Sequence, residues 1–96
     1  PIEVWQGVEI KNLTTLGERS ATGMDSERGV YVLSVNPLES MHTQLKTNDV
    51  ILKVNNQPTN TTQEFKEALK EHKAGDKITL TVFRSQKEVS LSVVLR

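Results

Sequence analysis

The sequence predicts a small α+β domain, a compact or partly open β-barrel or sandwich of about five strands with one long and one short helix. Two observations predict this class. Stretches in which apolar and polar residues alternate recur along the chain, whereas apolar residues at helical spacing occur in only two stretches. The connections between these stretches are short. At 96 residues the chain makes one domain, which is long enough to bury a core without metals or disulfides.

The composition excludes several classes of protein. Twelve basic and twelve acidic side chains leave no net charge, so the chain lacks the basic footprint of a nucleic-acid-binding domain. There is no cysteine, hence no disulfide, thiol nucleophile or thiolate zinc site. No apolar run is long enough to span a bilayer, and no signal peptide is expected in this stretch. Because the chain starts abruptly at Pro1 and ends on a strand, we expect a domain excised from a longer protein.

The first stretch, Pro1–Asn12, contains a half-buried strand in which apolar Val8 and Ile10 alternate with charged residues. The strand is entered through Trp5-Gln6-Gly7. A glycine just ahead of a strand usually marks a bend that a Cβ would obstruct. Such a bend is either a simple turn or a loop whose amides point at an anion, and the residues alone favour the turn.

Leu13–Arg28 is polar and weakly patterned, and we expect a loop with one helical turn, interrupted at Gly17 and stopped at Gly23. Gly29–Asn36 has the alternation of a strong strand, which the following proline ends. Leu38–Leu45 fits a short helix.

In that short helix, Met41 and Leu45 are spaced i, i+4 and are expected to face the core. Asn48 then lies in a turn, where we expect a left-handed conformation. The central stretch, Asp49–Thr59, reads as a strand that is buried at its start and ends in a turn before Pro58.

The long helix is predicted over Thr61–Lys73, because Phe65, Ala68 and Leu69 fall on one face. Thr61 or Thr62 is expected to cap its start, and Gly75 to close its end.

Two alternating strands, Asp76–Arg84 and Lys87–Leu95, follow as a hairpin joined by Ser85-Gln86. Since the sheet edges are short strands, the edge next to the long helix is predicted to be able to accept an added strand.

No catalytic or metal-binding pattern stands out. His42 and His72 are not at metal-ligand spacing, no serine lies in a GxSxG elbow, and no glycine-rich phosphate loop is present. A triad assembled in space remains open on sequence grounds, although two scattered histidines in so small a domain are more often surface residues. The sequence therefore predicts a non-enzymatic domain that needs no cofactor or metal.

The run GVYVLSVNP…LKTNDVILKVNNQPTNTTQEFKEAL resembles a PDZ domain of the bacterial HtrA/Deg serine-protease type. The residues that stand at that family's characteristic places are Gly29-Val30, Pro37, Leu45, Asp49-Val50-Ile51, Val54-Asn55 and Ala68-Leu69. Trp5-Gln6-Gly7-Val8 is similar to the family's aromatic-x-Gly-aliphatic carboxylate-binding loop. Asn48 and Asn56 replace usual glycines, Gln6 replaces a commonly aliphatic residue, and Leu38–Gln44 is one residue short.

The resemblance implies the PDZ fold with the bacterial, permuted strand order. It implies that backbone amides of Gln6, Gly7 and Val8 hold the carboxylate of a peptide, which adds as a strand beside Val8–Asn12. The other wall of the groove would be the helix Thr62–Leu69. The implied groove residues are Glu9, Ile10, Lys11, Thr62, Phe65, Lys66 and Leu69, with Val8, Ile10 and Leu69 forming the apolar pocket for the last side chain.

Alternatives stay open for individual residues of this groove. Phe65 and Leu69 are each also consistent with a purely core position, equally so for Phe65. Lys66 is more consistent with a solvated surface position than with a peptide contact. The segment Leu13–Arg28 is an alternative occupant of the groove. Replacing Gly7 with a bulky β-branched residue is expected to abolish tail binding and leave the fold intact.

The implied function is a non-catalytic module that recognises C-terminal or extended hydrophobic peptide segments by β-strand addition. Its expected partners are peptide or protein C-termini and an attached HtrA/Deg-like serine protease, in the cell envelope or periplasm and in protein quality control. No nucleic acid or direct membrane insertion is expected. The alternative is a PDZ-like structural spacer with a closed groove in a protease or secretion complex. An autonomous enzyme ranks last.

Overall fold

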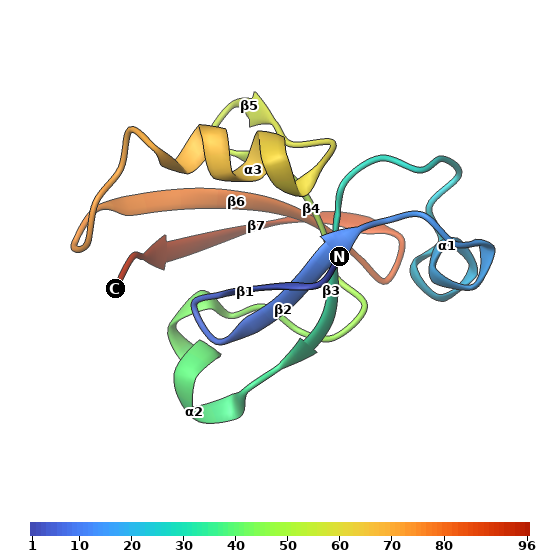
Figure 1. The fold of residues 1–96 in the computed structure, drawn as a ribbon, viewed down its shortest axis with the longest axis horizontal. Helices are drawn as coiled ribbons and strands as arrows, with labels where there is room; N and C mark the ends of the chain where they lie inside the picture. The colour runs from blue at the N-terminus through green and yellow to red at the C-terminus, as the bar shows by residue number, and fades with distance from the viewer.

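The computed structural model describes residues 1–96 as one antiparallel sheet with three α-helices and a short 3-10 helix at its periphery (Figure 1). The elements in chain order are β1 (Glu3–Trp5), β2 (Val8–Asn12), α1 (Leu16–Thr22), β3 (Val30–Val35), α2 (Pro37–Ser40), η1 (Met41–Thr43), β4 (Val50–Val54), β5 (Gln57–Pro58), α3 (Thr62–Leu69), β6 (Lys77–Arg84) and β7 (Lys87–Val94). The predicted α+β class is confirmed.

The strands lie in the order β1-β2-β3-β4-β6-β7, and the two-residue β5 also pairs with β4. The predicted C-terminal hairpin is present: β6 and β7 pair from Lys77↔Val94 to Arg84↔Lys87. Its turn residues, Ser85 and Gln86, have φ of 51° and 61°, the positive values that a two-residue hairpin turn requires. Asn48 has the expected left-handed conformation, with φ of 73°.

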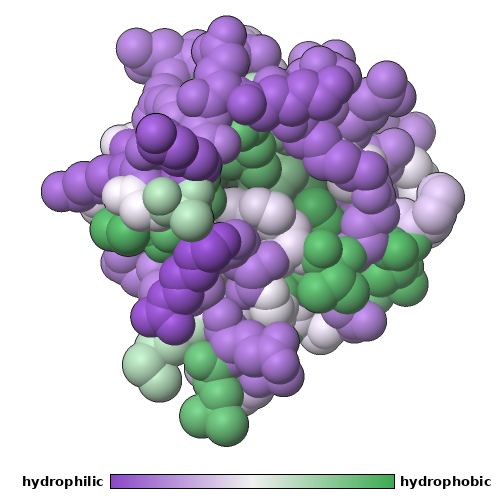
Figure 2. Space-filling model, turned by 60° about the vertical axis from the view of Figure 1, so that its left-hand side comes forward, coloured by the Kyte–Doolittle hydropathy of each residue, from purple (hydrophilic) through white to green (hydrophobic).

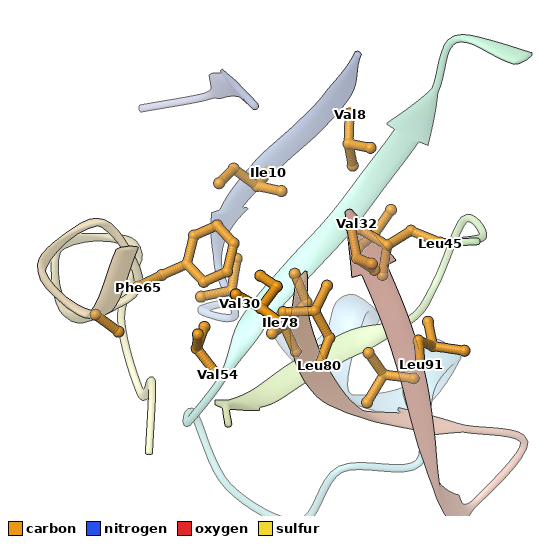
Figure 3. Packing of buried hydrophobic residues seen from close by; sticks show 14 of the residues in the cluster. Val8, Ile10, Val30, Val32, Leu45, Val54, Phe65, Ile78, Leu80 and Leu91 are labelled. Atoms are coloured by element: carbon orange, nitrogen blue, oxygen red, sulfur yellow. The ribbon is translucent and has the colours of Figure 1, made fainter. Parts of the chain in front are cut away.

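The core lies between the sheet and α3. A cluster of 15 buried apolar residues draws on β2, β3, β4, β6, β7 and α3, and Figure 3 shows Phe65 pointing from α3 toward Ile10, Val30 and Ile78. A second cluster of five residues lies at the other side of the sheet, where Tyr31, Val50 and Leu52 meet Leu13 and Met24. The helix α3 is therefore held against β2 by the main core.

The polar segment before β3 is more helical than the sequence pattern predicted, because α1 runs over Leu16–Thr22. Thr15 and Glu18 form a capping box: each side chain accepts a hydrogen bond from the other residue's backbone N–H. This cap offsets the cost of about 1 kcal/mol for Gly17 inside the helix. Gly23 ends the helix with φ of 80°, as expected.

The long helix is shorter than predicted. It begins after Thr61, whose side chain accepts from the Glu64 N–H, but ends at Leu69 rather than at Gly75. Beyond Leu69 the backbone tightens, and the His72 N–H donates to the carbonyl of Leu69, only three residues back. Gly75, with φ of 95°, instead belongs to the turn into β6.

The predicted helix over Leu38–Leu45 is split into α2 and η1, and the expectation for Met41 is wrong. Ser40 and Thr43 provide the buried face, so Met41 points outward and is 72% exposed. Leu45 is buried as predicted. None of the helices in the structure has the length and apolar character that crossing a bilayer requires.

Candidate functional site

The edge of β2 that lies nearest α3, where the sequence predicted an added strand, already carries one. The N-terminal strand β1 runs antiparallel along it, with the partners Glu3↔Ile10, Val4↔Glu9 and Trp5↔Val8. Figure 1 shows β1 folding back along β2. This strand was not predicted, and it rather than Leu13–Arg28 occupies the edge.

Two side chains of β1 contact α3. The ring of Trp5 meets that of Phe65 edge-on, with centroids 4.9 Å apart and planes at 82°. The carboxylate of Glu3 forms an ion pair with the ammonium group of Lys66. Hydrogen bonding from Lys66 lowers the pKa of Glu3 below its ordinary value, against an opposing effect of burial. Alternate residues of β1 therefore face the helix.

The turn between β1 and β2 consists of Gln6 and Gly7, with φ of 52° and 76°. These are the values of a two-residue hairpin turn. A Cβ on Gly7 would lie 2.6 Å from the Cβ of Glu39 and 2.8 Å from its carbonyl carbon. Replacing Gly7 would thus strain the fold itself, which corrects the expectation that such a change would affect binding alone.

The side chain of Gln6 connects this turn to two distant parts of the chain. Its Oε1 accepts from the Arg96 N–H (3.2 Å) and lies 2.6 Å from Nε2 of His42, while its Nε2 donates to the Arg96 carbonyl (3.0 Å). Burial, and secondarily the charge of Arg96, lowers the pKa of His42. A neutral His42 that donates through Nε2 satisfies this arrangement.

The two faces of β2 have different surroundings. Val8 and Ile10 are 0% and 1% exposed and belong to the main core. On the opposite face, Glu9 accepts a hydrogen bond from the hydroxyl of Ser34 (2.6 Å). Lys11 likewise turns away from the groove and pairs with Glu18 at 2.5 Å. With β1 in place, β2 offers an external peptide neither an open edge nor free side chains on the groove side.

The helix wall has two buried, one half-buried and one exposed member at the expected positions. Phe65 is completely buried in the core, and its ring also contacts Trp5 of β1. It is therefore a core residue that also faces the strand at the edge of β2. Leu69 is partly buried and packs against the main core. Lys66 is exposed apart from its ion pair. Thr62 is buried, and its N–H donates to Oδ1 of Asn12 (2.7 Å), which fixes the start of α3 to the end of β2.

The apolar pocket expected from Val8, Ile10 and Leu69 is filled. None of the surface hollows in the structure is lined by residues of both β2 and α3. On the face drawn in Figure 2, hydrophobic surface appears as separate patches between hydrophilic areas and not as a continuous groove. The structure places the predicted site residues around one edge, but that edge is closed by β1.

Comparison with known proteins decides the family. The family model described as the PDZ domain matches residues 7–95 of the chain. The chain belongs to the PDZ domain family. A PDZ domain is a binding module without catalytic activity of its own, in agreement with the sequence prediction.

Several solved structures resemble this PDZ domain. The HtrA-type protease AlgW, solved with a decapeptide, matches 97% of the chain with a TM-score of 0.76 and 26% identity. The PDZ domain of HtrA3, bound to the phage-derived ligand FGRWV, matches the whole chain and 88% of its own with a TM-score of 0.76 and 21% identity. A solution structure from Geobacillus thermodenitrificans is 32% identical over 74% of this chain and 82% of its own, with a TM-score of 0.62.

The predicted resemblance to HtrA-type PDZ domains is confirmed by these neighbours. This PDZ domain spans 29% of the length of AlgW, so most of that protease has no counterpart in the chain. No curated protein sequence matches the chain.

Sequence reasoning missed the two residues of β1 that contact α3, Glu3 and Trp5. A signal was present: an extended Glu3-Val4-Trp5 precedes Gln6-Gly7, which has the glycine that a hairpin turn favours. The alternation pattern alone does not identify this strand, because three residues are too few for it.

Proposed function

We propose that this PDZ domain binds extended hydrophobic peptide segments, C-terminal ones above all, as a strand added to β2 in front of α3. The observation that carries the proposal is β1 itself. This short strand runs antiparallel to β2, and its C-terminal end meets the Gln6–Gly7 turn. A peptide bound by β-strand addition would use the same backbone groups of β2.

In this proposal the loop and the helix have separate tasks. The amides of Gln6, Gly7 and Val8 receive the terminal carboxylate once the turn opens, because several N–H donors converging on one point favour an anion. The backbone from Glu9 to Lys11 pairs with the peptide, and α3 contributes Thr62, Phe65, Lys66 and Leu69 as the second wall. Alternate side chains of the peptide then face the helix, as those of β1 do.

The solved neighbours support a peptide ligand, since AlgW was solved with a decapeptide and the HtrA3 PDZ domain with FGRWV. They also support the wider setting that we propose. The domain would regulate, or deliver substrate to, an attached HtrA/Deg-like serine protease in the cell envelope and contribute to protein quality control. The attached protease and the compartment rest on the family alone.

The second candidate function is a structural spacer with a closed groove, which serves assembly of a protease or secretion complex. One observation favours it: β1 covers the edge of β2, and the side chains behind it are fully buried. The two candidates differ in whether β1 gives way to a ligand.

A two-dimensional NMR titration of the ¹⁵N-labelled domain distinguishes them. Peptides with a free apolar C-terminus are added, and the same peptides with an amidated C-terminus serve as controls. Peptide recognition predicts shifts at Gly7, Val8 and Leu69 that are lost on amidation. If no peptide in a diverse pool with free C-termini shifts these residues, the spacer is the correct function.

A further inference from the structure

We infer that β1 stands in for the peptide ligand, and that the peptide displacing it carries an acidic side chain two residues before a large apolar, preferably aromatic, one. In the structure these two places belong to Glu3 and Trp5. The inference rests on the proposed function, to which it adds the chemical class of the ligand and the competitor already present in the chain.

The direction and register of β1 make it a suitable stand-in. It is antiparallel to β2, and its last residue, Trp5, lies opposite Val8 at the turn proposed to receive the carboxylate. Glu3 lies opposite Ile10, two residues earlier. Successive strand residues point to opposite sides, so a peptide in the same register would direct its last side chain and the one two places before it toward α3.

The surroundings of these two places define the chemistry that they accept. The last place is bounded by the ring of Phe65, which favours another ring at its edge. Val4, between the two places, points away from the helix and is 71% exposed, so the intervening residue is not selected.

The acidic preference comes from Lys66, the cation that α3 presents to β1. The other charged groups near it have partners of their own: Lys70 pairs with Glu67 at 3.1 Å, and the Glu64 carboxylate accepts from the Asn60 N–H at 2.8 Å. Lys66 takes its partner from β1, namely Glu3. When β1 leaves, Lys66 loses that partner, and an acidic side chain of the ligand replaces it.

The contacts of β1 with the helix are weak enough for a peptide to displace the strand. The strand has three residues, and the side chains of Glu3 and Lys66 are 32% and 55% exposed. An exposed ion pair of this kind changes an equilibrium by about two- to fivefold. Because β2 has one edge facing the helix, β1 and a peptide exclude each other.

The exclusion is tested by locking β1. The chain has no cysteine, so the double variant Val4→Cys/Glu9→Cys can form only one disulfide. The two positions are direct cross-strand partners, and such residues have Cα atoms at a separation that a disulfide spans. The probe is the acetylated peptide Ile-Glu-Val-Trp with a free C-terminus, titrated by NMR. We expect at least tenfold weaker binding to the oxidised than to the reduced form, and equal affinity of the two forms would overturn the inference.

The acidic preference is tested with a second peptide, Ile-Lys-Val-Trp, and the variant Lys66→Glu. The wild-type domain should prefer the Glu peptide by about two- to fivefold, and Lys66→Glu should reverse the preference. Lys70→Glu is the matched control, because it makes the same charge change at the residue that follows the last residue of α3 and should keep the wild-type preference. A preference that stays the same in Lys66→Glu would overturn the acidic assignment.

The two proposals fail in different ways. If no peptide binds the wild-type domain, Lys66→Glu or the reduced double variant, the proposed peptide-binding function itself is wrong. A second outcome is that peptides bind, but oxidation of the double variant does not lower their affinity and Lys66→Glu does not change the preference between the two peptides. Peptide binding then stands, and only the role assigned to β1 is wrong.

Discussion

The indole of Trp5 stands edge-on against the phenyl ring of Phe65, with ring centroids 4.9 Å apart. Phe65 is fully buried in the main core, so this contact joins the edge strand β1 directly to the centre of the domain. The same ring thus serves both the stability of the fold and the wall of the proposed groove. A peptide that replaces β1 therefore has to fit against a ring whose position is set by the packing of the core.

The fluorescence of Trp5 should report the departure of β1, because Trp5 is the only tryptophan of the chain. We expect a red shift of its emission when a tryptophan-free peptide, such as Ile-Glu-Val-Phe with a free C-terminus, binds. The indole would leave its partly buried place against Phe65 for water. The shift should saturate with the same affinity that NMR gives, and peptide binding without any change of emission would contradict the displacement of β1.

Gly7→Ala should destabilise the domain by about 2–4 kcal/mol, as measured by urea unfolding. The residue has φ of 76°, and an added Cβ would lie 2.6 Å from the Cβ of Glu39. Gly75→Ala is the matched control, since Gly75 has φ of 95° but no atom within 4 Å of an added Cβ. We expect only the conformational cost there, about 1 kcal/mol. Equal losses in the two variants would show that contact with Glu39 has no influence.

The strands and the core were predictable because their signal is local. Alternation along β3, β6 and β7 identifies a strand without reference to the rest of the chain, and the Ser85-Gln86 turn separates two such runs. The start of α1 also has a local signal, since Thr15 and Glu18 have the spacing of a capping box. The weak apolar pattern and Gly17 nevertheless made the sequence predict only one helical turn there.

Other features depend on contacts that no local pattern contains. The contacts of β1 with α3 depend on where the helix places Phe65 and Lys66, far along the sequence. Likewise, α3 ends at Leu69 although its helix-forming pattern continues to Lys73, because the chain there tightens and turns into β6. The family resemblance predicted a groove between β2 and α3 but carried no information about β1, which covers that edge of β2.

Asp49→Ala should lower the free energy of unfolding by about 3 kcal/mol, because it leaves a partly buried arginine without its carboxylate partner. Asp49 is 1% exposed, and Arg84 donates to both of its carboxylate oxygens, from Nε at 2.9 Å and from Nη2 at 2.7 Å. The hydrogen bonds from Arg84 to Asp49 also raise the pKa of the guanidinium. Urea unfolding at pH 7 measures the loss.

Arg84→Lys provides the comparison for this pair. It keeps a positive charge near Asp49 but loses the two parallel hydrogen bonds, so we expect a smaller loss of about 1–2 kcal/mol. The ordering of the two variants is the essential result. If Asp49→Ala were as stable as the wild type, the attraction between Asp49 and Arg84 would only balance the free-energy cost of removing the two charges from water.

Glu18 should make the stability of the domain depend on pH in the acid range. Burial alone would raise its pKa, but hydrogen bonds from Lys11 and from the amides of Thr14 and Thr15 outweigh it and lower the pKa to about 2. A carboxyl whose pKa is depressed by folding contributes stability above its unfolded pKa of about 4.5, and this contribution disappears as the pH falls through the folded value. Glu18→Gln should therefore be less stable than the wild type by about 1–2 kcal/mol at pH 7.

Urea unfolding of both proteins at pH 7, 4 and 2.5 tests this dependence. The difference between them should stay constant down to about pH 5 and then shrink between about pH 4.5 and 2, because the wild type loses the contribution that the variant lacks. Glu27→Gln, at an exposed position, controls for the loss of one negative charge and should change the stability at pH 7 by less than about 0.5 kcal/mol. A difference between Glu18→Gln and the wild type that persists unchanged at pH 2.5 would assign the effect to side-chain shape rather than to the ionised carboxylate.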